Sequence, residues 1–284
     1  MNHKIKVPYK KSYTSKLLAW VTRAAAMLAM AVLIFIIGFI LVKGVRYLSP
    51  ELFSPHYTSE NSSLFPALVN TLFMTVLTLL IAAPIGISAA IFLVEYSDHE
   101  GKVAGVIRVT AETLSGIPSI VYGLFGMLFF STALGWGYSM LAGAFTMAIM
   151  ILPLIMRTSE EALVSVPVSY REASFGLGAG RLRTIFKVVL PAAVPGILSG
   201  IILAVGRVVG ETAALIFTAG TVAEYAGFMD SGRTLAVHMY VLSSEGLHMD
   251  QAYATAVVLL IFVFAMNRLS EYAAERISKG HVHE

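Results

Sequence analysis

The chain has 284 residues, of which 57% are hydrophobic and only 13% are charged, and its formal net charge is +3. The charged fraction is about half of that in an ordinary soluble domain, which excludes a water-soluble globular protein because a soluble core cannot bury so much apolar surface. The chain has no cysteine, but this leaves its class open, since neither a disulfide framework nor a thiolate metal site is inferred.

The first predicted element is the uncharged run from Ala24 to Val42, which is long enough for a helix to cross the roughly 30 Å hydrocarbon core of a bilayer. A cleaved signal peptide would have an apolar region of only about 7–15 residues ending at a small-residue site. This run is longer and is followed by Lys43 and Arg46, so we expect a retained first helix.

Further apolar segments predict additional membrane-spanning helices. They lie at about 66–94, 103–130, 138–156, 193–217 and 251–267. The fold class expected is therefore an all-α integral membrane protein with six transmembrane helices, the last having the shortest apolar core. We divide it into residues 1–65 (N-terminal tail, first helix and first external loop), 66–270 (core) and 271–284 (C-terminal tail).

An even number of spans places both termini on one side of the membrane. Most of the 20 Lys and Arg residues lie in the tails and in the loops after the second and fourth spans. By the positive-inside rule, these segments and both termini are predicted to be cytoplasmic. Of the external segments, 43–65 indicates a loop, whereas 218–250 contains "RTLAVHMYVL", which favours a short interfacial helix.

The cytoplasmic loop at 157–192 is expected to form short helices. In "RTSEEALVSVP", Thr158 or Ser159 is a candidate helix start and Pro167 a stop. "REASFGL" predicts a second helix that ends at Gly178, and "RLRTIFKVVLP" a third that leads into the fifth span. The simple alternative is a solvated basic loop whose charge only reflects topology.

The spacing in this loop is more specific than its charge. Glu172-Ala173-Ser174 is followed after three residues by Gly178, and after nine more by Val188-Val189-Leu190-Pro191. This resembles the EAA loop of type I ABC importer permeases, with Ser for the second Ala and Val for Ile. The resemblance implies a cytoplasmic coupling helix between the fourth and fifth spans that docks in a separate ATPase subunit. The expected coupling residues are Arg171, Glu172, Ala173, Gly178, Leu190 and Pro191, with Arg171 and Glu172 fixing the register in the ATPase groove.

Three further stretches are similar to the phosphate-specific branch of that family. They are "NTLFMTVLTLLIAAPIGISAAIFLVEYS", "ETLSGIPSIVYGLFG" and "GRVVGETAALIFTAG", the last being closer to PstA-type than to PstC-type subunits. The resemblance implies a bacterial or archaeal plasma membrane complex that imports inorganic phosphate. Its other members would be a PstC-like permease, two PstB-like ATPase subunits and an external PstS-like phosphate-binding protein.

The sequence lacks motifs for catalysis within this chain. It contains no G-x-x-x-x-G-K-[ST] phosphate loop, no H-E-x-x-H and no evident nucleophile and base. We therefore expect no enzymatic activity, no catalytic residue and no cofactor or metal in this chain, with ATP and Mg bound by the partner ATPase.

Ionisable residues inside spans are candidates for a substrate pathway, because a charge at the bilayer centre is costly. They are Glu112 in the third span and Arg207 and Glu211 in the fifth. On a continuous helix Arg207 and Glu211 share one face, where an i,i+4 ion pair is the structural alternative. We favour phosphate binding by Arg207, whose planar fork fits phosphate oxygens, with Glu211 as its resting partner.

Proline and glycine interrupt two of the predicted spans. "APIGIS" at 83–88 and "SGIPS" at 115–119 each indicate a kink or a break, and we place a gate at Ser115, Gly116, Pro118 and Ser119. The fifth span also has small residues at Gly196, Gly200, Gly206 and Gly210, which favour close helix packing.

Two other functions remain open at this point. One is a permease for another oxyanion, such as sulfate or molybdate. The other is a membrane scaffold or sensor that binds a cytoplasmic partner without transport, against which Arg207 and Glu211 argue because they place charge inside the membrane.

Overall fold

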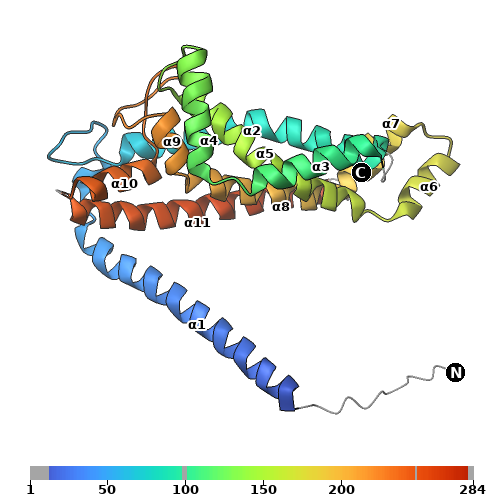
Figure 1. Cartoon of the computed structure of the whole chain (residues 1–284), viewed down its shortest axis with the longest axis horizontal. Helices are drawn as coiled ribbons and strands as arrows, with labels where there is room; N and C mark the ends of the chain where they lie inside the picture. Colours follow the sequence, from blue (N-terminus) through green and yellow to red (C-terminus); the bar gives the residue numbers. More distant parts are fainter. Residues whose placement is uncertain (1–12, 98–100, 247, 281–284) are drawn as a thin grey trace.

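A computed structural model describes residues 13–97, 101–246 and 248–280, and all regular structure in these residues is helical (Figure 1). The predicted cytoplasmic tail residues 1–12 and 281–284 lie outside the described residues. The α-helices are α1 (Tyr13–Gly44), α2 (Phe65–Ile91), α3 (Lys102–Ser115), α4 (Ser119–Gly126), α5 (Met140–Val164), α6 (Val168–Gly176), α7 (Arg181–Thr184), α8 (Leu190–Val209), α9 (Ala213–Thr218), α10 (Leu235–Glu245) and α11 (Met249–Gly280). Short 3-10 or π-helical turns are η1 (Val45–Tyr47), η2 (Pro50–Phe53), η3 (Phe92–Tyr96), η4 (Met127–Ala133) and η5 (Ile185–Val189).

The described residues contain 5 helices long and apolar enough to cross a membrane, or 6 if one bent pair is a single span. The straight candidates are Ser15–Tyr47, Phe65–Tyr96, Met140–Val164, Arg181–Val209 and Met249–Arg276. The fold is thus that of a multi-pass helical membrane protein, as hydropathy predicts.

The predicted third span is not one helix. Its two parts, α3 with α4 and η4, meet at an angle of 101°. The α-helix ends at Ser115 because the following residues form tighter turns, with Ile117 N donating to Leu114 O at 3.1 Å. Pro118 then precedes α4; it lacks an N–H and disfavours helical geometry at Ile117.

The fourth span is longer than predicted, and no new helix begins near Thr158. Helix α5 starts after Ser139, whose Oγ accepts a hydrogen bond from Ala142 N at 3.2 Å, and runs without interruption to Val164. Thr158 Oγ1 instead donates to Leu154 O at 2.9 Å, inside the same helix. The helix ends before Pro167, which is the N-cap of α6.

Helix α5 is the centre of the bundle, since 67% of its apolar window is buried against α2, α8 and their neighbours. Its contact with α8 is close: a Cβ added at Gly200 would lie 2.0 Å from Thr158 Oγ1, and one at Gly196 would lie 2.6 Å from Ala162 Cβ. This confirms the predicted packing role of Gly196 and Gly200. Gly206 and Gly210 make no comparable contact with another described helix.

Helix α11 is longer than the predicted span at 251–267, and it continues through residues expected to form a tail. It extends to Gly280, and Arg268 Nη1 bonds Glu271 Oε2 at 3.0 Å beyond the apolar part. Side-chain pairs at this spacing stabilise a helix in water, so a helix predicted from hydropathy alone ends too early in the sequence.

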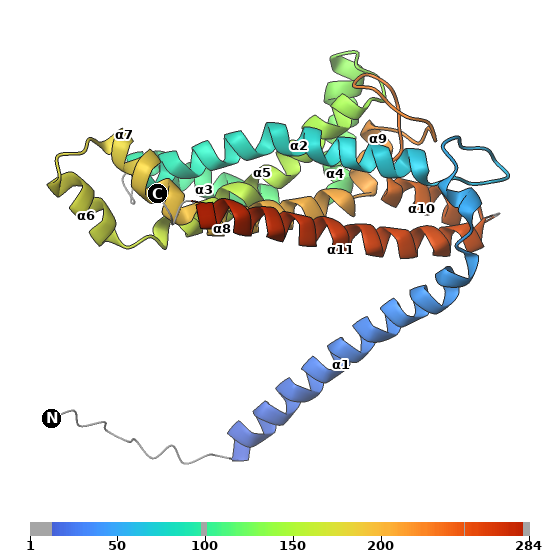
Figure 2. The ribbon, with the colours of Figure 1, turned by 180° about the vertical axis from the view of Figure 1, so that it is seen from behind.

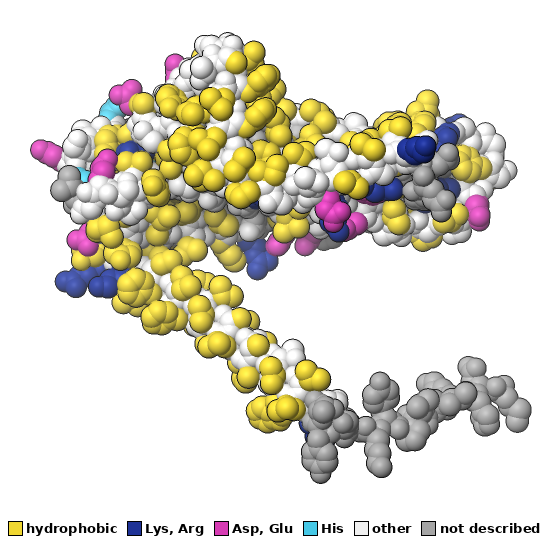
Figure 3. Space-filling model, in the orientation of Figure 1, with side chains coloured by type: hydrophobic (Ala, Val, Ile, Leu, Met, Phe, Trp, Pro, Cys, Tyr) yellow, Lys and Arg dark blue, Asp and Glu magenta, His cyan; other side chains and the backbone are white. Residues whose placement is uncertain are grey.

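Helix α1 stands away from the bundle, which it meets only near its C-terminal end (Figure 2). None of its apolar window is buried against the described residues. Where it meets α11, Gly44 is so close that an added Cβ would lie 2.2 Å from Tyr253 O. Hydrophobic side chains cover the exposed length of α1 and much of the visible bundle, and Lys and Arg gather in a few places that include the end formed by α6 and α7 (Figure 3).

The segment predicted as a short interfacial helix forms α10, at the end of the bundle opposite α6. It is covered by the loop that follows α1, because Tyr57 in this loop packs against two buried polar side chains. The Arg233 guanidinium carbon lies 4.6 Å from the centre of the Tyr57 ring, and the His238 ring meets the same ring edge-on at 6.1 Å.

Candidate functional site

A cavity of about 550 Å³ opens between α3, α5 and α8. Its size falls within the roughly 300–1,000 Å³ range of small-molecule sites. It lies in the part of the bundle nearer α6, since α3 and the last turns of α5 approach that end in both views (Figures 1 and 2). The charged and hydroxyl side chains that line it are Arg108, Glu112, Ser115, Arg157, Glu160, Glu161 and Arg207.

Two of the cavity arginines are paired with carboxylates on α5. Arg108 Nε lies 2.8 Å from Glu160 Oε1 and joins α3 to α5, while Arg157 Nε lies 3.3 Å from Glu161 Oε1 one turn along α5. Arg207, by contrast, has no hydrogen-bond or ion-pair partner within the described part of the chain. The cavity therefore presents a cation whose donors remain available to an anion.

The predicted arrangement of Arg207 and Glu211 is wrong in one respect. Helix α8 ends at Val209, so Glu211 does not continue on the helix face of Arg207. Glu211 Oε1 instead accepts a hydrogen bond from Ala214 N at 3.1 Å, in the first turn of α9. The carboxylate is thus engaged at a helix N-terminus, where the macrodipole favours negative charge, and the expected ion pair is not formed.

The other predicted pathway residue lies on the cavity wall. Glu112 and Ser115 both line the cavity from α3, and Arg207 lines it from α8. Of the residues predicted as a gate, Gly116 and Pro118 lie in the break between α3 and α4, and Ser119 begins α4. Their role in gating stays a prediction.

Sequence reasoning missed four cavity residues. It counted Arg108 and Arg157 only as cytoplasmic charges, and it took Glu160 and Glu161 as acids in the first turn of a separate helix. One signal could have found Arg108, because residues 108, 111, 112 and 115 follow the i, i+3, i+4, i+7 spacing of one helix face. The α5 residues could not be found in this way, since the predicted helix stopped at 156.

The predicted coupling segment forms α6, which projects at one end of the molecule (Figure 1). Glu172 and Ala173 are exposed there. The helix ends as predicted around Gly178, which has φ of +82° and donates from its N–H to Phe175 O at 2.9 Å. Ala179 N donates to Ser174 O at 3.1 Å, which completes a Schellman motif and explains why glycine stands at this position.

A second cavity of about 330 Å³ is lined by α6, the Gly178 turn, α7 and η5. Arg183 and Lys187 both line it. Further along the chain, Leu190 and Pro191 form the first turn of α8 and are partly buried, so the last residues of the motif belong to the bundle and not to the projecting segment.

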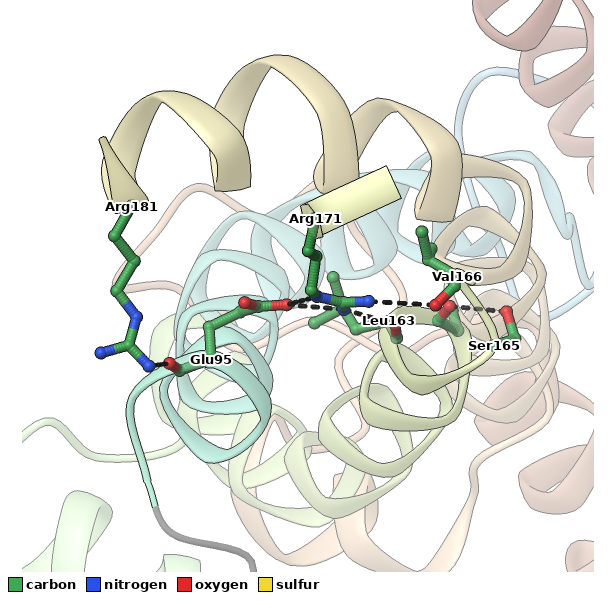
Figure 4. Close-up of polar contacts among 7 residues, drawn as sticks. Glu95, Leu163, Ser165, Val166, Arg171 and Arg181 are labelled. Carbon is green, nitrogen blue, oxygen red and sulfur yellow. Dashed lines mark hydrogen bonds and ion pairs between the residues drawn. The ribbon is translucent and has the colours of Figure 1, made fainter. Parts of the chain in front are cut away.

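Arg171 does not face outward as predicted. Its guanidinium is turned toward its own bundle, where Nε and Nη2 bind Glu95 Oε1 at 3.0 and 2.7 Å (Figure 4). Of the two residues expected to fix the register in a partner, only Glu172 is therefore free to do so.

The arrangement combines a charged cavity with a bundle of membrane-spanning helices. Within the described residues, no group of three or more His, Cys, Asp or Glu side chains is placed to hold a metal ion. A helical membrane bundle with a charged cavity and a projecting helix is the architecture of a permease, the membrane-spanning subunit of a transporter.

The chain belongs to the family of binding-protein-dependent transport system inner membrane components, which its residues 82–279 match. It is 33% identical to a probable ABC transporter permease protein, YqgI, of Bacillus subtilis over 95% of this chain and 98% of that protein. It is 30% identical to the phosphate transport system permease protein PstA of Haemophilus influenzae, over 94% and 95% of the two chains. PstA 1 of Mycobacterium tuberculosis is 35% identical over 72% of this chain and 67% of its own length.

Solved structures agree on the fold. A bacterial alginate ABC transporter chain aligns with a TM-score of 0.68 at 16% identity, over 95% of this chain and 99% of its own. A chain of the MetNI methionine ABC transporter in an inward-facing form aligns with a TM-score of 0.58 at 20% identity, over 77% and 94%. At such identities the likeness establishes the type I ABC importer permease fold and nothing about the cargo.

Proposed function

We propose that this chain is the PstA-like permease subunit of an ATP-driven importer of inorganic phosphate and forms one half of the translocation pathway. It has no catalytic role of its own, and ATP is hydrolysed by a PstB-like ATPase dimer that contacts α6. A PstC-like permease supplies the other half of the path, and an external PstS-like protein delivers phosphate. The chain lies in the plasma membrane with α6 and both termini on the cytoplasmic side.

The observation that carries this proposal is the unpaired Arg207 on the wall of the cavity. A guanidinium presents a planar fork that matches two phosphate oxygens, and in a low-dielectric path it offsets the cost of moving an anion. The ion pairs of Arg108 and Arg157 with α5 carboxylates leave Arg207 as the cavity arginine most open to cargo. The PstA names of two relatives favour phosphate among oxyanions.

The test is uptake of radiolabelled phosphate into vesicles that contain the complete complex. Arg207→Ala should insert and assemble but lose uptake, because no other described cavity cation is free to replace it. Arg207→Lys should recover uptake poorly, since an ammonium group is a point charge without the two-pronged geometry. Parental uptake by Arg207→Ala would place the path elsewhere.

The cargo is decided in the same vesicles by competition. Excess unlabelled phosphate should suppress the signal, and sulfate or molybdate should not. Uptake of labelled sulfate or molybdate in place of phosphate would change the cargo to another oxyanion. ATP-dependent uptake of none of the three would favour a scaffold or sensor.

A further inference from the structure

The π-helical turn η3, which continues α2, carries a buried carboxylate outside the cavity. Glu95 is only 8% exposed, and Arg171 from α6 binds its Oε1 through both Nε and Nη2 (Figure 4). An exposed ion pair would contribute little to stability, but both partners here are largely shielded from water, since Arg171 is also only 16% exposed. Removing one partner would leave the other charge buried and unpaired.

The same guanidinium also binds the end of α5. Arg171 Nη1 donates to Val166 O at 3.0 Å, and Nη2 donates to Leu163 O at 3.1 Å. These carbonyls lie where α5 ends and have few partners within the helix. One side chain therefore joins α6 to two different elements, the α2 end and the α5 end.

Apart from its chain connection to α5 through residues 165–167, helix α6 has few other attachments. Ser174 is its one buried residue within the described chain, and its Oγ lies 2.8 Å from Thr184 Oγ1 in α7. Helix α7 is also held to η3. Arg181 in α7 donates a hydrogen bond to Glu95 O, and its guanidinium carbon lies 4.9 Å from the centre of the Tyr96 ring. Both short helices of the coupling segment thus meet the bundle at Glu95.

The attachment leads directly to the cavity. Glu160, Glu161 and Val164 line the cavity from the last turns of α5, next to the Leu163 carbonyl that Arg171 holds. Residues 165–167 already join α5 to α6 covalently, and the bonds of Arg171 fix the geometry of this short connection. A displacement of α6 that preserves these bonds therefore moves this end of α5 with it, whereas a displacement that breaks them is partly absorbed by bending of residues 165–167. A rigid link of this kind needs a fixed geometry, which the fork of arginine supplies and lysine does not.

We propose that the Glu95–Arg171 ion pair is the link that passes a movement of α6, driven by an ATPase, to the cavity wall on α5, with Glu95 as a positioning residue. The inference rests on the proposed function for the source of the movement, but not on phosphate as the cargo. Glu95 acts through Arg171 and touches neither cargo nor ATP.

The experiment follows the movement itself in the complete complex in vesicles. Spin labels are attached to cysteines placed at Val164 on α5 and Leu269 on α11, which are 57% and 63% exposed; the chain has no cysteine of its own. Their distance is measured without nucleotide and with ATP trapped by vanadate. The variants are Glu95→Gln, Arg171→Lys and the double variant, and the control is Glu271→Gln, which breaks the exposed pair of Glu271 with Arg268 on α11.

We expect the ATP-dependent distance change to be present in the parent and in Glu271→Gln, and to be lost in Glu95→Gln and Arg171→Lys while ATP hydrolysis continues. Phosphate taken up per ATP should fall about fivefold or more. The double variant should be no worse than the single ones, because both remove the same link. If Glu95→Gln does not assemble, the distance change in Arg171→Lys tests the proposal instead, because lysine keeps a positive charge beside Glu95 and only the fork geometry is lost.

A parental distance change in the variants that assemble would overturn the proposal. If phosphate is not the cargo, the result is different. The parent would then take up no phosphate, but an ATP-dependent distance change in the parent that is lost in the variants would still support the link.

Discussion

At the scale of single residues, Gly178 has the most direct structural explanation. It occupies the left-handed position that ends α6, where a β-branched side chain is strained by about 1–2 kcal/mol. Gly178→Val should therefore displace the end of α6 while leaving the bundle intact. In vesicles with the whole complex we expect normal insertion, continued ATP hydrolysis and reduced phosphate uptake per ATP.

Gly176→Ala is the matched control for that experiment. Gly176 is helical and lies two positions earlier, and an added Cβ there meets no described atom within 4 Å. It should retain coupling and slightly stabilise the helix. Equal coupling in Gly178→Val and Gly176→Ala would remove α6 from the coupling path.

The residues also show where sequence reasoning stops. The spacing of Glu172 and Gly178 was sufficient to predict α6 and its end, because helix and cap are set by neighbours in the chain. The direction of Arg171 was not predictable, since its partner Glu95 is 76 positions away and the choice between partner and own bundle depends on how α6 is rotated. Likewise, Arg207 was found from its cost in a membrane, whereas the partner of Glu211 depends on where α8 ends.

At the scale of elements, the contact between α5 and α8 depends on the absence of a side chain at Gly200. Gly200→Ala should destabilise the chain by about 1–3 kcal/mol, because its Cβ would overlap Thr158 Oγ1. Gly206→Ala is the comparison on the same helix, where the nearest described atom, Asn267 Oδ1, would lie 3.9 Å away. We expect a lower midpoint of thermal unfolding in detergent for Gly200→Ala only, and equal midpoints would contradict this packing.

Helix breaks were predicted unevenly. The break at 116–118 carries both glycine and proline, and either residue weakens a helix by itself. The break at 210–212 has Gly210 but no proline. Hydropathy therefore predicted the fifth span as one apolar helix of 25 residues at 193–217. The new helix that follows is stabilised locally, because Ala214 N donates a hydrogen bond to Glu211 Oε1 three positions earlier, and hydropathy does not register such a bond.

At the scale of the whole molecule, the end of the bundle opposite α6 contains a buried group that links stability to pH. Burial lowers the pKa of His238 to about 3 from its usual 6.5, and the nearby Arg233 cation acts in the same direction. Between pH 6.5 and about 3, the unfolded chain binds a proton at His238 and the folded chain does not. Acidification through this window should therefore favour unfolding.

The measurement is the thermal midpoint in detergent at pH 7.5 and pH 4.5, for the parent and for His238→Gln. Both midpoints fall as carboxylates protonate, but the fall should be smaller for His238→Gln, which has no imidazole to charge. Identical falls in the two proteins would show that His238 is already protonated, or accessible to protons, in the folded state.

The isolation of α1 has a consequence for how the protein is made. With a mean hydropathy of 3.0 and no burial of its apolar window, α1 can enter the bilayer without help from any later part of the described chain. The window of α5 has a hydropathy of 1.9 and is 67% buried, and the helix contains Pro153 and several charges near its end. During synthesis, therefore, α1 leaves the ribosome before the helices that line the cavity, and it needs none of them to be stable in the bilayer. The central helix acquires its stable environment only after α8 has followed it into the membrane.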